Sequence, residues 1–160
     1  MPILRRLSDG DLPEVLRVQE VAYAATLNEP GEAFAAKIGV FPAGAIGCFE
    51  GADMIGYVFS VPWTLGEVMP LHHAPLLPRR GADCLYVHDM AVQPDRRGRG
   101  VAVRLLEALT EVALKEGLRH LALTAVQGSE GFWARLGFQE ERRFEYAPGV
   151  PASYMVAKVP

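Results

Sequence analysis

Residues 93–102 read QPDRRGRGVA and place three arginines and two glycines within ten positions. The apolar run before them, which ends at Val92, predicts a strand, and the residues after them predict a long helix. A strand that enters a helix through glycines suits an anion, because the first helical N–H groups lack partners within the helix. Glycine lets the backbone approach the anion closely, and arginines add positive charge and forked donors. The stretch therefore predicts a phosphate-binding turn; the alternative is a solvated basic turn that caps a helix.

The segments on either side of this turn predict one mixed α/β domain. Apolar residues at helical spacing predict a helix over Gly98–Gly117, after a strand over Cys84–Val92. Further strands are predicted at Pro2–Leu7, in a hairpin over 45–61, and at Leu121–Val126, Phe138–Tyr146 and Ser153–Val159. Further helices are predicted at Leu12–Leu27, Glu32–Ile38 and Glu130–Leu136. The inner side and the edge of the first of these helices are marked by Leu12, Val15, Leu16 and Gln19. Residues 62–83 are predicted to form a long loop, of a length that is often functional. Because no repeat or linker interrupts the chain, we expect a single domain over residues 1–160.

Composition narrows the class of protein. The 160 residues are half apolar, but they hold no run of about 18 uncharged apolar residues that would span a membrane. A net charge of −3 argues against a general nucleic-acid surface. The first residues lack the basic-then-apolar order of a signal peptide, so we expect a cytoplasmic protein that binds neither nucleic acid nor membrane. Cys48 and Cys84 lie in apolar runs and are predicted to be core residues rather than disulfide partners or metal ligands.

Two segments together resemble the GCN5-related N-acetyltransferase (GNAT) family. Residues 97–102, RGRGVA, match the family's acetyl-CoA signature [QR]-x-x-G-x-[GA], between a strand that ends in MAV and a long helix. Residues 131–138, GFWARLGF, resemble the family's FYxKxGF segment. The resemblance implies the GNAT fold, an α/β (α+β) architecture. Its central sheet is mixed, mostly antiparallel and twisted, with about six to seven strands flanked by about four helices, and is splayed at the strand that binds the cofactor.

The resemblance also implies where acetyl-CoA, the co-substrate, would lie. In the family the pantetheine arm occupies a gap beside the splayed strand, which implies backbone contacts from Met90, Ala91 and Val92. The pyrophosphate would be held by the backbone amides of Arg97, Gly98, Arg99, Gly100, Val101 and Ala102. The side chains of Arg97 and Arg99 would either bind the phosphates as well or be surface charges without a role in binding. Trp133 stands where the family often carries a tyrosine. The position of the family's asparagine is Val126, so that Gln127 or Ser129 would take over its pantetheine contact.

The implied chemistry is acyl transfer from a thioester to an amine, by direct attack in a ternary complex. It needs a neutral amine, a polarised carbonyl and a proton for the departing thiolate. His88 on the splayed strand is the candidate base, because histidine titrates near neutrality; the alternative is a histidine bonded within the sheet. Asp89 would face the opposite side unless a bulge reorders the strand, and would orient His88 or a substrate ammonium. Indole is not a usable acid, which leaves as proton sources Tyr154, Tyr146, Tyr86 or water.

For the acceptor, the residues leave open an arylalkylamine, a polyamine, an amino acid and a protein N-terminus. Residues 62–83 are expected to wall its site, with apolar Trp63, Leu65, Met69 and Leu71 and with Glu67 as an ammonium partner. His72 and His73 adjoin in this loop, but no further ligand stands at metal spacing, and we predict no metal. We predict an acetyl-CoA-dependent N-acetyltransferase acting on a small molecule or peptide; the alternative is a non-catalytic acyl-CoA sensor on the same fold. Homodimer formation is left open.

Overall fold

The computed structural model describes residues 1–70 and 80–160. These residues form one seven-stranded sheet in the order β1-β2-β3-β4-β5-β7-β6. The strands are β1 (Ile3–Arg6), β2 (Ala45–Glu50), β3 (Asp53–Trp63), β4 (Cys84–Val92), β5 (His120–Ala125), β6 (Gln139–Ala147) and β7 (Val150–Lys158). Strands β4 and β5 are parallel, whereas every other neighbouring pair is antiparallel. The expected mixed, mostly antiparallel sheet is therefore confirmed.

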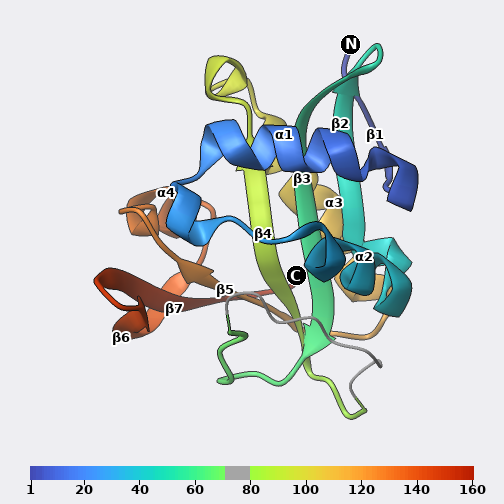
Figure 1. Cartoon of the computed structure of the whole chain (residues 1–160). Coiled ribbons are helices and arrows are strands. Elements are labelled where there is room, and N and C mark those ends of the chain that lie inside the picture. The colour runs from blue at the N-terminus through green and yellow to red at the C-terminus, as the bar shows by residue number, and fades with distance from the viewer. Residues whose placement is uncertain (71–79) are drawn as a thin grey trace.

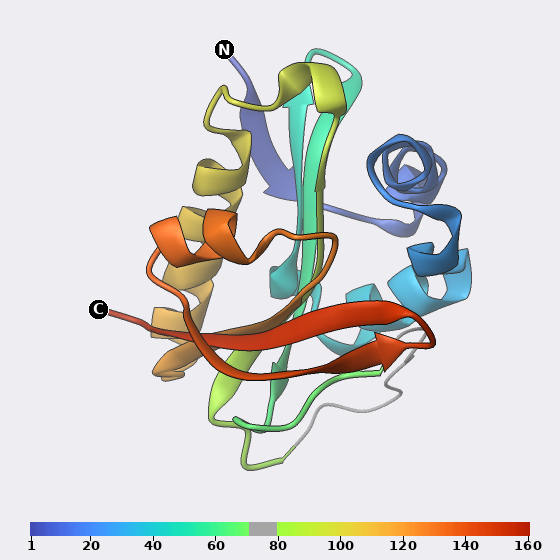
Figure 2. The same ribbon diagram turned by 90° about the vertical axis from the view of Figure 1, so that its left-hand side faces the viewer.

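Helices cover both faces of this sheet (Figures 1 and 2). They are α1 (Leu12–Ala22), α2 (Gly31–Val40), α3 (Val101–Lys115) and α4 (Glu130–Arg135). Figure 2 views the sheet from its side, with α1 and α2 on one face and α3 and α4 on the other. No helix within residues 1–70 and 80–160 is long and apolar enough to cross a membrane.

Two apolar layers hold the helices against the sheet. The layer on the α3 side joins helix residues to strand residues, among them Val101, Leu105 and Leu109 with Ile46, Val58 and Leu85. The layer on the α1 side is aromatic, and packs Val15, Val18 and Phe34 against Phe49, Tyr57 and Phe59. Burying each such side chain stabilises the fold by about 1.5–3 kcal/mol. The strands between the two layers are therefore held from both faces, which fixes where β4 ends and the turn after it begins.

Strand β4 leaves its neighbour β5 half-way along its length. The two strands pair only from Leu85 to Val87, opposite Leu121 to Leu123. From Asp89 to Val92, β4 stays paired with β3 but has no partner among the described residues on the β5 side. The sheet is thus splayed at the strand where the resemblance predicted a splay.

A bulge lies where this splay begins. Along β3, Phe59 pairs with Asp89 and the next residue, Ser60, pairs with Val87. His88 is therefore the extra residue of β4, and such an insertion bends the strand and changes which side chains share a face. Both His88 and Asp89 consequently reach one cavity, which strict alternation along the strand would not allow.

Gly56 allows the start of α3 to sit close to β3. A Cβ atom at this position would lie 2.9 Å from Cγ1 of Val101 and 3.1 Å from the carbonyl oxygen of Ala91. Contacts that short would force a shift of the first helical turn or of β4. The absence of a side chain at Gly56 thus helps to place the turn at residues 93–100 against the end of the splayed strand.

The first helix is shorter than the sequence predicted. It ends at Ala22 rather than Leu27, because Tyr23 is extended (φ −121°, ψ 155°) and the chain then crosses toward β4. Residues Ala25–Leu27 form a separate short 3-10 turn. The predicted Val15 and Gln19 are buried, together with Val18, whereas Leu16 is 37% exposed and lies at most at the edge of the inner side. This early end creates the segment between α1 and α2 that closes one side of the cavity.

Candidate functional site

A cavity of about 770 Å³ lies along the splay between β4 and β5. The last five residues of β4, His88 to Val92, form one wall, and Leu123 and Thr124 of β5 contribute to the other. One end of the cavity reaches the turn at residues 96–100 and the first residues of α3, and the other reaches Glu29 and Tyr146. The volume falls within the range of about 300–1,000 Å³ that is typical of small-molecule sites. The cavity thus joins the predicted anion-binding turn to the predicted base.

The turn has the backbone conformation that its glycines suggested. Gly98 and Gly100 have φ angles of +78° and +81°, in the left-handed region that favours glycine. Gly100 directly precedes α3, so the first N–H groups of a 15-residue helix begin at the cavity wall. A Cβ at either glycine would meet no protein atom within 4 Å, so the space beside the turn is open. The turn therefore offers unpaired donors and positive potential to an anion.

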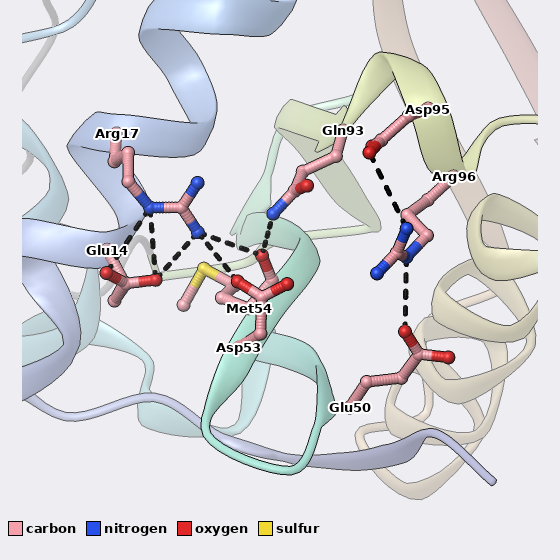
Figure 3. A network of polar contacts seen from close by, with 8 residues as sticks. All are labelled: Glu14, Arg17, Glu50, Asp53, Met54, Gln93, Asp95 and Arg96. Atoms are coloured by element: carbon pink, nitrogen blue, oxygen red, sulfur yellow. Dashed lines mark hydrogen bonds and ion pairs between the residues drawn. The ribbon is translucent and has the colours of Figure 1, made fainter.

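A polar network anchors the segment that leads into this turn (Figure 3). The carbonyl oxygen of Met54 accepts hydrogen bonds from Gln93 Nε2 at 2.6 Å and from Arg17 Nη2 at 3.3 Å. Arg17 also pairs with Glu14 of α1 and with Asp53. These contacts tie α1 and the start of β3 to Gln93, the first residue after β4. The start of the turn is fixed before the chain reaches its glycines.

The arginines of the turn have different surroundings. Arg96 donates from Nε to Glu50 at 3.1 Å and lies 3.5 Å from Asp95, so its charge is already paired (Figure 3). Arg97 points to the end of α1, where Nη2 is 3.5 Å from the carbonyl oxygen of Ala22. Arg99 is exposed and makes no hydrogen bond or ion pair with the described residues. Of the three, Arg97 and Arg99 keep charge available for a ligand.

The middle of the cavity presents two ionisable side chains of β4. The His88 side chain is 1% exposed, and its Nε2 lies 3.6 Å from Oε1 of Glu29. Asp89 is buried and accepts a hydrogen bond from the Tyr57 hydroxyl at 3.1 Å. Burial raises the pKa of Asp89 to about 7, and the hydrogen bond from Tyr57 opposes that rise. Both groups therefore line the cavity, and the Asp89 carboxyl can hold a proton near neutral pH.

The sequence analysis missed two of the side chains around these groups. Tyr23, just past α1, donates a hydrogen bond from its hydroxyl to the carbonyl oxygen of Met90. Glu29, between α1 and α2, is buried at 5% exposure and lines the cavity beside His88. An available signal was Gln19, a polar residue on the inner side of α1, whose amide binds the main chain of Glu29. A buried amide needs such partners.

The residues proposed for the pantetheine arm all line the cavity. Trp133 is 9% exposed, and its ring packs against Phe138 at 5.5 Å between centroids. Gln127 has a positive φ of 55°, and its Oε1 accepts a hydrogen bond from the Ala24 amide at 3.1 Å. Ser129 precedes α4 and donates to the Val126 carbonyl oxygen at 2.7 Å. Gln127 thus links the segment after α1 to the segment after β5, whereas the Ser129 hydroxyl bonds within the turn that precedes α4.

Of the three candidate tyrosines, one lines the cavity. Tyr146 lies at its Glu29 end, and its hydroxyl donates to the Met69 carbonyl oxygen at 3.3 Å. Tyr154 is 1% exposed and does not line the cavity; its hydroxyl accepts a hydrogen bond from the Gly66 amide at 2.6 Å. Tyr86 also lies outside it, in a hydrogen bond with Thr124, and burial raises its pKa to about 12. The structure therefore moves Tyr154 away from the site in which the sequence analysis had placed it.

The described part of the loop that was expected to wall the acceptor site does not line the cavity. Trp63, Leu65 and Met69 pack in a third apolar cluster with Tyr86 and Tyr154. None of these residues, nor Glu67, belongs to the described lining, which includes Leu27 and Glu29 of the segment between α1 and α2. Leu71, His72 and His73 lie outside the described residues. Within residues 1–70 and 80–160, no group of three or more His, Cys, Asp or Glu side chains is placed to hold a metal ion.

Comparison with known proteins identifies the family. The model of the Acetyltransferase (GNAT) family matches residues 7–138. The chain belongs to this family. Membership confirms the resemblance seen at residues 97–102 and 131–138, and it makes the protein a member of an acyltransferase family. It favours an enzyme over the non-catalytic sensor that the sequence had left open. No curated protein matches the chain in sequence.

Solved structures of GNAT proteins share the fold. The loading GNATL domain of CurA from Lyngbya majuscula superposes with a TM-score of 0.87 at 13% identity, over 99% of this chain and 98% of that one. The GphF GNAT-like decarboxylase in complex with isobutyryl-CoA gives 0.86 at 14% identity, over 99% and 100%. The PaiA N-acetyltransferase from Thermoplasma acidophilum in complex with coenzyme A gives 0.73 at 14% identity, over 99% of each chain. The predicted GNAT fold is thus confirmed along the whole chain.

Proposed function

We propose that this GNAT protein transfers an acetyl group from acetyl-CoA to the amine of a small molecule or peptide. The observation that carries the proposal is the cavity along the splayed strands, which runs from the turn before α3 to His88. Such a cavity suits an elongated ligand with an anionic end and a reactive end. Two solved neighbours bind CoA or an acyl-CoA, as their names state.

Acetyl-CoA would lie with its pyrophosphate at the start of α3. The amides of residues 98–102, around the start of α3, provide donors to the phosphates, and the side chains of Arg97 and Arg99 supply charge; the Arg97 amide itself bonds to the Pro94 carbonyl oxygen. The pantetheine arm would follow Met90, Ala91 and Val92, whose β5 side carries no strand pairing. The hydroxyl of Tyr23 holds the Met90 carbonyl oxygen and would give way to an amide of the arm. The thioester would then reach the bulge at His88.

The proton transfers follow from the groups at the bulge. The neutral amine attacks the thioester carbon, a C–N bond forms, and the C–S bond breaks as CoA departs as a thiolate. His88 takes the proton that the amine nitrogen loses, directly or through a water molecule. An alkyl thiol has a pKa of about 8.5, so the thiolate takes a proton from water near neutral pH without a dedicated acid. The indole of Trp133 at the position of the family's tyrosine is compatible with this route.

Release of free CoA thiol in the presence of a panel of amines tests the proposal. The panel should include a polyamine, an arylalkylamine, free amino acids and a peptide with a free N-terminus. His88→Gln should lower turnover by about 10²–10⁴-fold and leave acetyl-CoA affinity nearly unchanged. His120→Gln, at the start of β5 and outside the cavity lining, is the matched control. A wild-type protein that binds acetyl-CoA but acetylates no amine of the panel would contradict the proposal.

A second candidate is a reaction on the acyl group that keeps the thioester, of the decarboxylase kind named for GphF. The observation in its favour is Trp133, because a C–S bond that stays intact needs no acid beside the sulfur. The buried carboxylate of Glu29 opposes it, since its negative charge would repel a substrate carboxylate. Malonyl-CoA distinguishes the two reactions. Decarboxylation would convert it to acetyl-CoA without release of thiol, whereas amine acylation releases thiol.

A further inference from the structure

Glu29 is buried in the cavity wall and held rigidly from behind. Gln19 of α1 donates from Nε2 to the carbonyl oxygen of Glu29 at 2.9 Å, and its Oε1 accepts from the Glu29 amide at 2.6 Å. Gln19 itself is 2% exposed. One residue later, Pro30 leads into the first turn of α2. Two hydrogen bonds and a helix start therefore fix the backbone that carries the Glu29 carboxylate.

That carboxylate faces the candidate base. Its Oε1 lies 3.6 Å from Nε2 of His88, and the two side chains are 3% and 1% exposed. The distance is within ion-pair range and longer than a hydrogen bond, so a small shift would bring the two atoms into bonding contact. Burial keeps water from screening the pair. A carboxylate beside one ring nitrogen of a histidine selects the tautomer that carries hydrogen on that nitrogen.

Other charged and titratable groups surround the pair of His88 and Glu29, and each interacts with His88, Glu29 or Asp89. They are Tyr23 after α1, Lys37 of α2, Tyr57 of β3, Tyr86 and Asp89 of β4, and Tyr146 of β6. Lys37 is buried, and desolvation lowers the pKa of its ammonium group while the charge of Glu29 opposes that change. The Asp89 carboxyl bonds to the Tyr57 hydroxyl. The Glu29 carboxylate is the acidic group that lies within ion-pair range of the His88 imidazole.

We infer that Glu29 is a positioning residue for His88, an inference that rests on the proposed acetyl transfer. With hydrogen on Nε2 directed at Glu29, the basic nitrogen of His88 is Nδ1, which receives the proton of the attacking amine. The imidazolium that results is stabilised by the negative charge of Glu29. Gln19 acts through Glu29 by fixing its main chain, and neither residue contacts the reacting atoms.

The test is ¹⁵N NMR of the His88 imidazole during a pH titration of the ligand-free protein, in the wild type and in Glu29→Gln. In the wild type the neutral ring should carry hydrogen on Nε2. In the variant the protonation midpoint of the ring should fall and the neutral ring should become a mixture of tautomers. Glu32→Gln, the same substitution at an exposed position of the first turn of α2, should leave both unchanged. If Glu29→Gln does not fold, Glu29→Asp keeps the charge and withdraws it by one methylene group.

Kinetics supply the second readout. Glu29→Gln should lower kcat by about 10- to 100-fold, a part of what a general base contributes, with acetyl-CoA affinity unchanged. The acid limb of its pH–rate profile should move to lower pH together with the NMR midpoint. An unchanged midpoint and tautomer in Glu29→Gln would overturn the inference whatever the activity. A wild-type protein that acetylates no amine would refute the proposed function, and the NMR titration would still decide the pairing.

Discussion

Asp89 makes the stability of the fold depend on pH in a way that one substitution reveals. Burial raises its pKa from an ordinary 3.8 to about 7. Below about pH 4 both the folded and the unfolded chain hold the proton, and ionisation favours neither state. As the pH rises toward 7 the unfolded chain loses the proton first, so the free energy of unfolding falls by about 1.4 kcal/mol per pH unit. Above about pH 7 both states are ionised and the loss is complete.

Asp89→Asn removes this ionisation and keeps an oxygen that can accept from Tyr57. Between about pH 5 and pH 8, the free energy of unfolding of Asp89→Asn should rise by about 2–3 kcal/mol relative to that of the wild type. Urea denaturation of both ligand-free proteins at several pH values measures this difference, in which the other titrating groups cancel. A difference that stays constant across the range would refute the buried, proton-holding state of Asp89. Any constant offset reports only the exchange of hydrogen bonds.

Three further substitutions test the remainder of the cavity. Arg99→Gln should weaken acetyl-CoA binding by about 1–2 kcal/mol in calorimetry, because it removes charge beside the pyrophosphate, whereas exposed Arg119→Gln should not; equal affinities would place the phosphates elsewhere. Gly100→Val and Gly117→Val both force a positive φ on a branched residue, so each should lower the free energy of unfolding by about 1–2 kcal/mol in thermal melts. Only Gly100→Val should weaken acetyl-CoA binding; an equal effect of both substitutions on binding would argue against phosphate binding at the turn before α3. Trp133→Tyr should keep acetyl-CoA affinity within about threefold and leave turnover level or higher, since it adds a hydroxyl near the sulfur; loss of binding would show that Trp133 is a wall of the cavity.

The sequence predicted the parts of the fold that local pattern controls. Strand Cys84–Val92 has the bounds that its apolar run indicated, and the hairpin over 45–61 lies within β2 and β3. The turn at 97–100 has left-handed glycines because its sequence allows little else. The bounds of β4, the hairpin and the glycine turn depend on residues close to one another in the chain. The bulge at His88 does not, because the pairing of β4 with β3 decides it.

The missed parts of the site depend on contacts between distant segments. Glu29 is a charged residue between two predicted helices, a place usually exposed to water. Its burial follows from Gln19, ten residues earlier, and from its position against β4. Tyr154 was assigned to catalysis on its residue type alone, but the β5–β7 pairing turns its hydroxyl toward Gly66. Neither arrangement has a signal within a short window of sequence.

The central claim is that acetyl-CoA lies in the splay between β4 and β5 with its pyrophosphate on the turn before α3. Amide-resolved hydrogen exchange, with and without saturating acetyl-CoA, tests both ends of this claim at once. The account predicts new protection at Gly98, Gly100 and Ala102 and at residues 90–92 of β4. The amides of β1 and β2, on the far side of the sheet, should exchange as before. The account would be contradicted if acetyl-CoA stabilised the fold without slowing exchange of these amides. It would also be contradicted if millimolar acetyl-CoA changed no exchange rate.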